Sequence, residues 1–130
     1  MNSLGIRVAL VDDADVIRCS IHEILSIWGY TVVLKAVNGK DLFRQLTMAS
    51  APDICITDLN MPVMNGFETI KELKEKWPEI KIIAFSMTNN KKEEEKAMKA
   101  GAHAFVSKLS SITELQRVLK SMKQPAGSGC

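Results

Sequence analysis

The sequence predicts an α/β protein of the (βα)5 type, in which a doubly wound, five-stranded parallel sheet carries helices on both faces. Three observations favour this fold class. Five short apolar segments alternate with amphipathic ones, four of the apolar segments are hydrophobic almost throughout, and 130 residues suffice for one domain only. Strands and helices that alternate in one domain form right-handed crossovers, and one reversal of winding direction covers both faces of the sheet.

The five predicted strands are short and rich in β-branched residues. Continuous apolar runs are typical of strands buried on both faces, whereas the second segment is more mixed in polarity, which indicates an edge strand. The predicted strands span residues 6–11, 31–35, 54–57, 80–85 and 104–107.

The first three intervening segments predict helices. In the first and the third, apolar residues recur with the period of one helix face, and Pro78 ends the third. The second helix, from about residue 39 to residue 48, has the weakest pattern. The apolar stripes are Ile17, Ile21, Ile24, Leu25 and Trp28 in the first helix and Phe67, Ile70, Leu73 and Trp77 in the third.

The last two helices begin at capping patterns. Asn90 followed by Glu93 predicts a capping box, and Gly101 ends that helix as its C′ residue. Ser111 with Glu114 begins the fifth helix in the same way. Its apolar stripe comprises Ile112, Leu115, Val118, Leu119 and Met122.

Composition narrows the functional classes. The net charge is +2, from 17 basic and 15 acidic residues that are evenly mixed, which argues against a dedicated nucleic-acid binder. No apolar run could span a membrane and the first residues lack a signal-peptide pattern, so we expect a cytoplasmic protein. We expect residues 1–123 to form the domain, and residues 124–130 have the composition of a flexible tail or the start of a linker.

The cysteines and histidines give no sign of a zinc site or a disulfide framework. Cys19 and Cys55 lie among apolar neighbours and are expected in the core, while Cys130 lies in the polar tail. His22 and His103 are expected on the surface or on helix faces rather than as metal ligands.

Polar residues capable of chemistry stand at the carboxyl ends of four predicted strands. Asp12 and Asp13 follow the first strand, Asp58 the third, Ser86 the fourth and Lys108 the fifth. In the flavodoxin-like strand order 2-1-3-4-5 these strands are successive neighbours, roughly 4.8 Å apart, so the side chains converge on one pocket.

Three carboxylates in one pocket repel one another unless a cation neutralises them. Oxygen ligands favour Mg²⁺, for which Asp13 and Asp58 would be direct ligands, Asp12 mostly a water-mediated one, and the backbone carbonyl of Asn60 a further one. Lys108 offers a point charge suited to a phosphoryl oxygen, and Asp carboxylates are known nucleophiles that form aspartyl phosphates.

The order of these motifs resembles one family. Asp12-Asp13, the stretch 58–66 (Asp-Leu-Asn-Met-Pro-Val-Met-Asn-Gly), Ser86 and the stretch 105–108 (Phe-Val-Ser-Lys) together resemble the receiver domain of response regulators, from residue 6 to about residue 122. The resemblance implies that Asp58 is the phosphoacceptor and that Asp12 and Asp13 hold Mg²⁺.

The same resemblance implies which residues sense the phosphoryl group and which affect its lifetime. It makes Ser86 and Lys108 the residues that sense the phosphoryl group, and Phe105 the aromatic switch, which is steric only because it lacks the hydroxyl of Tyr. Asn60 and Thr88 flank the site and would tune the phosphoryl lifetime.

The resemblance also implies partners. The donor would be a sensor histidine kinase or a phosphotransfer protein. Phosphorylation would alter the face formed by the fourth helix, fifth strand and fifth helix, including residues 91–98 and 109–122. This face would bind an output domain, a partner protein or a second copy in a phosphorylation-dependent homodimer. Neither nucleic acid nor membrane is an expected partner of this domain, and a turnover enzyme is not expected.

One position departs from the family pattern. Pro usually follows the lysine in a cis peptide, whereas Leu109 follows Lys108 here. A cis bond before a residue other than proline costs about 3 kcal/mol or more, so we expect a trans bond. Lysine followed by a residue other than proline resembles receivers attached to helix-turn-helix outputs of the LuxR and NarL kind.

Three alternatives share parts of this pattern. Residues 13–15, Asp-Ala-Asp, match the nucleophile motif of haloacid-dehalogenase-like phosphatases, but no acidic pair follows Lys108. Flavodoxin has the same fold, but acids after the first strand would repel the phosphate of FMN. The third alternative is a receiver that binds partners without being phosphorylated.

Overall fold

A computed structural model describes residues 5–47, 51–88, 90–110 and 112–122 of the chain. Its strands form one parallel sheet in the order β2-β1-β3-β4-β5, which confirms the predicted fold class and strand order. Along the chain the elements are β1 (Arg7–Val11), α1 (Asp15–Ile27), β2 (Thr31–Ala36), α2 (Gly39–Gln45), β3 (Ile54–Thr57), α3 (Gly66–Lys76), β4 (Lys81–Ser86), α4 (Lys91–Ala100), β5 (Ala104–Ser107) and α5 (Ile112–Met122).

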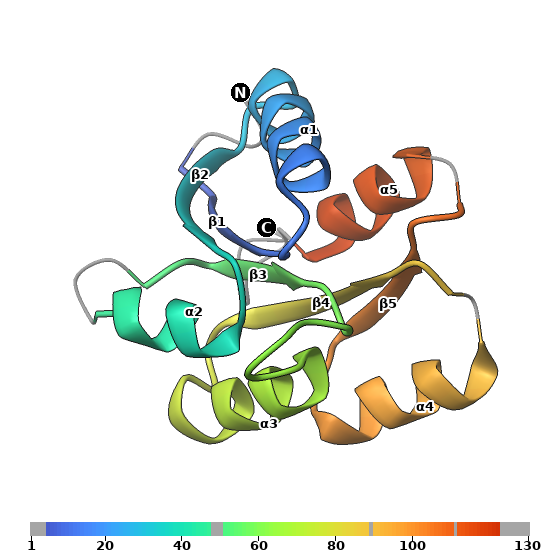
Figure 1. Cartoon of the computed structure of the whole chain (residues 1–130). Helices are drawn as coiled ribbons and strands as arrows, with labels where there is room; N and C mark the ends of the chain where they lie inside the picture. Colours follow the sequence, from blue (N-terminus) through green and yellow to red (C-terminus); the bar gives the residue numbers. More distant parts are fainter. Residues whose placement is uncertain (1–4, 48–50, 89, 111, 123–130) are drawn as a thin grey trace, which may run out of the picture.

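The sheet separates two hydrophobic cores. Figure 1 shows α1 and α5 on one face and α2, α3 and α4 on the other. Successive strand residues point to opposite faces, so Val8 packs with the α1 and α5 side while Ala9 packs with the other. Leu25 and Leu115 on the first side and Leu73 on the second are 0% exposed. Full burial of one such leucine contributes about 2 kcal/mol, so both helical layers are firmly held to the sheet.

Side-chain caps are present where all three helices on the second face begin, and those of α3 and α4 bear on the predictions. At α3, the Asn65 side chain accepts from the Glu68 amide at 3.0 Å while Glu68 accepts from the Asn65 amide at 3.1 Å, a full capping box that the sequence analysis did not predict. At α4, only half of the predicted box forms. Asn90 accepts from the Glu93 amide at 3.4 Å, but the Asn90 amide donates to Thr88 Oγ1 at 2.9 Å instead of to Glu93.

Several predicted boundaries move by one residue or more. β1 begins at Arg7 rather than residue 6, and β4 runs from Lys81 to Ser86 rather than over residues 80–85. α2 ends at Gln45, because Leu46 adopts extended backbone (φ −69°, ψ 131°). Residue 48, the predicted end of that helix, lies outside the described residues, as do Ser111 and the predicted tail, residues 124–130.

The prediction for the first cysteine is wrong. Cys19 is exposed on α1, since the helical period turns it away from Ile21, which is buried. Cys55 is buried as predicted, and burial raises the pKa of its thiol to about 12. Asp15 is the first residue of α1 and forms an ion pair with Arg18.

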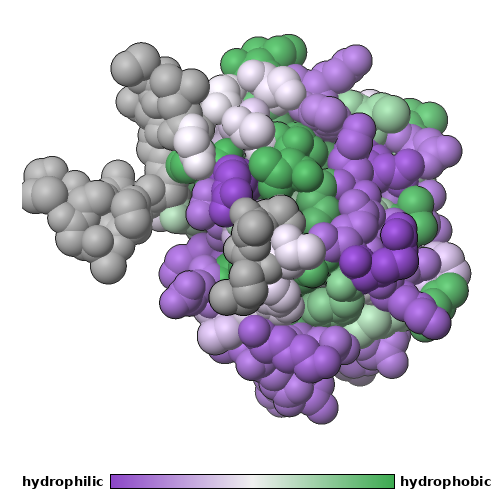
Figure 2. Space-filling model, turned by 90° about the vertical axis from the view of Figure 1, so that its left-hand side faces the viewer, coloured by the Kyte–Doolittle hydropathy of each residue, from purple (hydrophilic) through white to green (hydrophobic). Residues whose placement is uncertain are grey.

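The sheet has an open edge at β2. Val33 on this strand and Val37 just after it are exposed, and Figure 2, which views this side of the molecule, shows hydrophobic atoms among hydrophilic ones. β2 is thus an edge strand, as its mixed polarity predicts, and β5 is the other edge. Among the helices that the structure describes, none is long and apolar enough to cross a bilayer.

Candidate functional site

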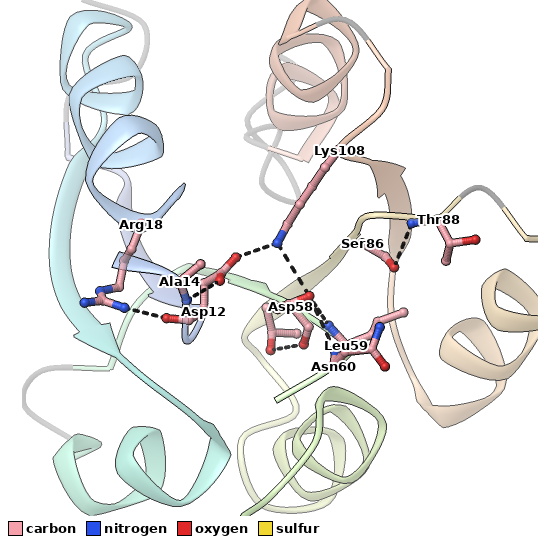
Figure 3. Close-up of polar contacts among 10 residues, drawn as sticks. Asp12, Ala14, Arg18, Asp58, Leu59, Asn60, Ser86, Thr88 and Lys108 are labelled. Carbon is pink, nitrogen blue, oxygen red and sulfur yellow. Dashed lines mark hydrogen bonds and ion pairs between the residues drawn. The ribbon is translucent and has the colours of Figure 1, made fainter. Parts of the chain in front are cut away.

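Strand register brings the predicted site residues to one edge of the sheet. Val11 of β1 pairs with Thr57 of β3, so Asp12 and Asp58, the next residues along each strand, are neighbours. Lys108 directly follows β5 and lies across from them (Figure 3). The carboxyl ends of parallel strands are where ligands bind in sheets of this kind.

Asp12 is buried, and each of its polar atoms has a partner. Its amide donates to the carbonyl of Ala36 at 3.0 Å, and its Oδ1 accepts from the amide of Ala14 at 2.9 Å. Its carbonyl accepts from Arg18 Nη1 at 2.6 Å, and its Oδ2 accepts from Lys108 Nζ at 2.7 Å. Four hydrogen bonds therefore fix the position of Asp12 in the turn after β1.

Asp58 is also buried, at 7% exposed, and the polar contacts of its carboxylate with described residues all involve Oδ1. Its Oδ1 accepts from the amide of Leu59 at 2.8 Å and lies 3.5 Å from Lys108 Nζ. Burial raises the pKa of Asp58, the positive charge of Lys108 lowers it, the negative charge of Asp12 raises it, and the net effect is upward. A carboxylate with a raised pKa is more basic than an exposed one, which favours attack on an electrophile.

The third carboxylate, that of Asp13, completes a group suited to a hard cation. One oxygen from each of Asp12, Asp13 and Asp58 lies within 4.8 Å of the others. Asp13 is exposed, and no described residue donates a hydrogen bond to its carboxylate or pairs with it. Three oxygen donors with one open toward solvent match the preference of Mg²⁺ for a few carboxylates plus waters.

Lys108 is the cation that the chain itself provides to this pocket. Its side chain is 7% exposed and contacts both Asp12 and Asp58, and Nζ lies 5.6 Å from the centroid of the Phe85 ring. The described residues contain no cis peptide bond, so the predicted trans bond between Lys108 and Leu109 is confirmed. The ammonium partly neutralises two carboxylates that would otherwise repel each other.

Ser86 and Phe105 lie behind the pocket on β4 and β5. Ser86 is fully buried, and its Oγ accepts from the amide of Thr88 at 3.3 Å. Phe105 pairs with Ala84 in the strand register and is partly buried against the core on the α2, α3 and α4 side. The structure thus brings the three carboxylates and Lys108 together, with Ser86 nearby and Phe105 further along the sheet.

Comparison with known families identifies the family to which this chain belongs. The model of the family described as "Response regulator receiver domain" matches residues 8–120, which is most of the chain. The chain belongs to the response regulator receiver family. This match leaves the alternatives of a haloacid-dehalogenase-like phosphatase and of flavodoxin without support.

Curated relatives fall into two kinds. The receiver is 34% identical over 120 residues to the nitrate/nitrite response regulator protein NarL of Escherichia coli K12, covering 92% of this chain but 54% of NarL. It is 37% identical over 105 residues to the chemotaxis protein CheY of Thermotoga maritima, covering 81% of this chain and 87% of that protein. The chain therefore spans about half the length of NarL and most of the length of CheY.

Solved structures agree. A two-component response regulator of the LuxR family from Aurantimonas sp. SI85-9A1 superposes with a TM-score of 0.84 at 29% identity, covering 90% of this receiver and 84% of that chain. The family, the parallel sheet and the acidic edge are thereby consistent with one another, and proteins of this family act in signalling.

Two residues shape the site of this receiver in ways that the sequence pattern did not predict. Gly66, the first residue of α3, packs so closely on the turn after Asp58 that a Cβ there would lie 2.1 Å from the carbonyl oxygen of Asp58. The capping pattern of Asn65 and Glu68 could have indicated this helix start. Arg18, which holds the carbonyl of Asp12, has no local signal, because its partner is fixed by tertiary structure.

The turn between Asp58 and α3 of the receiver is strained. Val63 has φ 69° and is 76% exposed, and among the described residues it is the only non-glycine residue with positive φ. The amide of Met64 donates to the carbonyl of Pro62 at 2.7 Å, which closes a three-residue turn around Val63. A β-branched residue in this region costs about 1–3 kcal/mol.

Proposed function

We propose that Asp58 accepts a phosphoryl group from a sensor histidine kinase or a phosphotransfer protein, with Mg²⁺ in the pocket, and that the change is read out on α4, β5 and α5. The observation that carries this proposal is the cluster of Asp12, Asp13 and Asp58 oxygens within 4.8 Å, with Lys108 reaching the two buried carboxylates. Independent helix caps would not place a lysine in register with three acids.

The proposed reaction is a group transfer onto one carboxylate oxygen of Asp58. That oxygen forms a bond to phosphorus while the bond from phosphorus to the donor's nitrogen or oxygen breaks, and the donor leaves with the electron pair. Asp58 must be ionised to attack, and Lys108 favours the ionised form against the effect of burial. In-line transfer of this kind depends mainly on positioning and charge neutralisation.

The residues present fit a magnesium ion. Asp13 and Asp58 would hold it directly together with the backbone carbonyl of Asn60, and Asp12 would contact it through water, since the Asp12 oxygens already accept from Ala14 and Lys108. When bound, the ion supplies positive charge against the incoming phosphoryl oxygens. Asn60 is exposed and Thr88 half-buried, so both are placed to affect access of water to the phosphoryl group and hence its lifetime.

The signal would leave through the groups behind the pocket. A phosphoryl group adds roughly two negative charges and three acceptor oxygens. Ser86 Oγ now accepts from the Thr88 amide, which leaves its hydroxyl hydrogen available to a phosphoryl oxygen. Movement of Ser86 would open space beside β4 into which Phe105 could turn, because Phe105 lies on the neighbouring strand.

The energies suffice for such a switch. Moving a two-state equilibrium almost completely takes about 5.5 kcal/mol of differential affinity. Charge-assisted hydrogen bonds from Ser86 and Lys108 contribute up to ~3 kcal/mol each. The affected face, formed by α4, β5 and α5, would then contact an output domain, a partner protein or a second copy. Since a kinase of this type donates inside the cell, we place the chain in the cytoplasm.

Intact-mass measurement after incubation with acetyl phosphate tests the proposal. We expect one phosphoryl increment that requires Mg²⁺, disappears in Asp58→Asn, and persists in the control Asp53→Asn, an exposed aspartate immediately before β3. Peptide mapping should place the label on Asp58. A label on Asp13, or an increment that survives Asp58→Asn, would overturn the proposal in favour of a phosphatase-like site.

A further inference from the structure

The turn that carries Asp13 is clasped by one guanidinium group. Arg18 Nη1 donates to the carbonyl of Asp12 at 2.6 Å, and Nη2 of the same residue forms an ion pair with the carboxylate of Asp15. In Figure 3, Arg18 comes from α1 and points toward the backbone of Asp12. The residues pinned in this way stand on either side of Asp13 in the chain.

Other arginines of the receiver form similar local pairs without such a bridge. Arg44 pairs with Asp41 and Arg117 pairs with Glu114, each three residues apart on a helix, and these arginine side chains are 73% and 70% exposed. The side chain of Arg18 is only 15% exposed. Exposed pairs of this kind contribute little by themselves, whereas the half-buried guanidinium of Arg18 also holds a backbone carbonyl and so restricts the distance between Asp12 and Asp15.

We infer that Arg18 is a positioning residue for the magnesium site, acting through Asp13. The inference rests on the proposed function. Asp13 is exposed and has no partner among the described residues, so nothing else orders its carboxylate. By holding the Asp12 carbonyl and the Asp15 carboxylate, Arg18 limits the conformations of the peptide between them, so less conformational entropy is lost when Asp13 binds the ion.

Charge acts in the opposite direction, which makes the inference testable. A guanidinium near the pocket repels a divalent cation, so if its charge were the main effect, removing Arg18 would strengthen magnesium binding. If the clasp is the main effect, removing it weakens binding. Arg18→Lys separates the two, because lysine keeps the positive charge but lacks the planar fork that bridges two acceptors.

The test is a Mg²⁺ titration followed by the NMR shifts of the Leu59 and Asn60 amides, in EDTA-treated protein at physiological salt. We expect the Kd for Mg²⁺ to rise about tenfold in Arg18→Lys, the range seen when a group that orients a metal ligand is lost. Arg44→Lys, in a matched pair on α2, should leave the Kd unchanged. Phosphorylation by acetyl phosphate should slow at low Mg²⁺ and recover at saturating Mg²⁺.

A second variant guards against misfolding. Asp15→Ala removes the other end of the clasp at an exposed position, so the fold should persist. Because it also removes a negative charge near the cation, only a rise in Kd that persists at high salt supports the clasp. An unchanged or lower Kd in Arg18→Lys, with Mg²⁺ binding intact in the unaltered chain, would overturn this inference alone. If the unaltered chain binds no Mg²⁺ at all, the proposed function fails and this inference fails with it.

Discussion

Replacement of Lys108 by Met should reveal how much the receiver depends on its internal cation. Methionine retains most of the length of the side chain but removes the charge that contacts Asp12 at 2.7 Å and Asp58 at 3.5 Å. At an effective dielectric constant of about 20 these two contacts correspond to about 6 and about 5 kcal/mol before desolvation is counted. Desolvation offsets most of this, and removal of one partner from a buried ion pair typically costs about 3–5 kcal/mol.

The loss of stability in Lys108→Met should depend on pH and on Mg²⁺. Lys108 lowers the pKa of Asp58 against the effect of burial, so in the variant this pKa rises further and the folded protein takes up a proton more readily. The difference in stability between the variant and the unaltered chain should therefore be smaller at pH 5 than at pH 7. Mg²⁺ should stabilise the variant more than the unaltered chain, because no lysine competes for the same oxygens; an ion at a hundred times its Kd contributes about 2.7 kcal/mol.

Urea unfolding followed by circular dichroism, in EDTA and then in Mg²⁺, measures these quantities. Lys120→Met, at an exposed position on α5, is the matched control and should change the free energy of unfolding by no more than about 0.5 kcal/mol. Equal stability of Lys108→Met and the unaltered chain in EDTA at pH 7 would refute the reasoning, as would equal stabilisation of both by Mg²⁺.

Four further outcomes follow from contacts described above. Asp58→Asn should stabilise the protein at neutral pH, because burial raises the pKa of Asp58 and its ionised form therefore lowers stability as the pH rises above about 4. Urea unfolding of both proteins from pH 4 to 7 should show that the difference between their free energies of unfolding increases. Gly66→Ala should lower the free energy of unfolding by roughly 3 kcal/mol or more, because its Cβ would overlap the carbonyl of Asp58. A thermal melt measures this loss, and an unchanged melting temperature would contradict the prediction. Val63→Gly should instead stabilise the fold by about 1 kcal/mol, since it relieves a positive φ at an exposed position; a lower midpoint in urea would contradict this. His103 Nδ1 accepts from the amide of Ile82 at 3.0 Å, and the pKa of His103 is lowered, first by burial and then by Lys81 and Lys74. The free energy of unfolding should therefore fall as the pH drops below about 6.5, and NMR titration of the ring should give a midpoint below that value.

The sequence was a good guide wherever one kind of interaction dominates. Continuous apolar runs locate the buried strands to within a residue, because hydrophobic burial outweighs every other term there. The site residues follow from the same fact, since a side chain placed directly after a buried parallel strand must lie at the carboxyl edge. Lys108 was predicted to face a phosphoryl oxygen, and its present pairing with Asp12 and Asp58 was not foreseen, because it reflects a balance of charges between residues far apart in the chain.

Predictions were less successful where two interactions compete for one group. Asn90 and Glu93 have the spacing of a capping box, yet the hydroxyl of Thr88 is nearer to the Asn90 amide and takes its hydrogen bond. Apolar neighbours in the sequence suggested a buried Cys19, but a helix separates neighbours by about 100° and places it on the solvent side. Such outcomes depend on three-dimensional placement that a linear pattern does not carry.

The bond between Lys108 and Asp12 joins residues 96 positions apart, from the last strand to the first. Contacts of such long sequence separation form late, because the loop-closure entropy must be overcome before they contribute. During synthesis, a ribosome-bound chain that ends before β5 would already contain all three acids but would lack their internal counter-ion. If Asp58 accepts a phosphoryl group as proposed above, an unfinished chain without β5 should not do so, because it lacks the lysine that contacts Asp58.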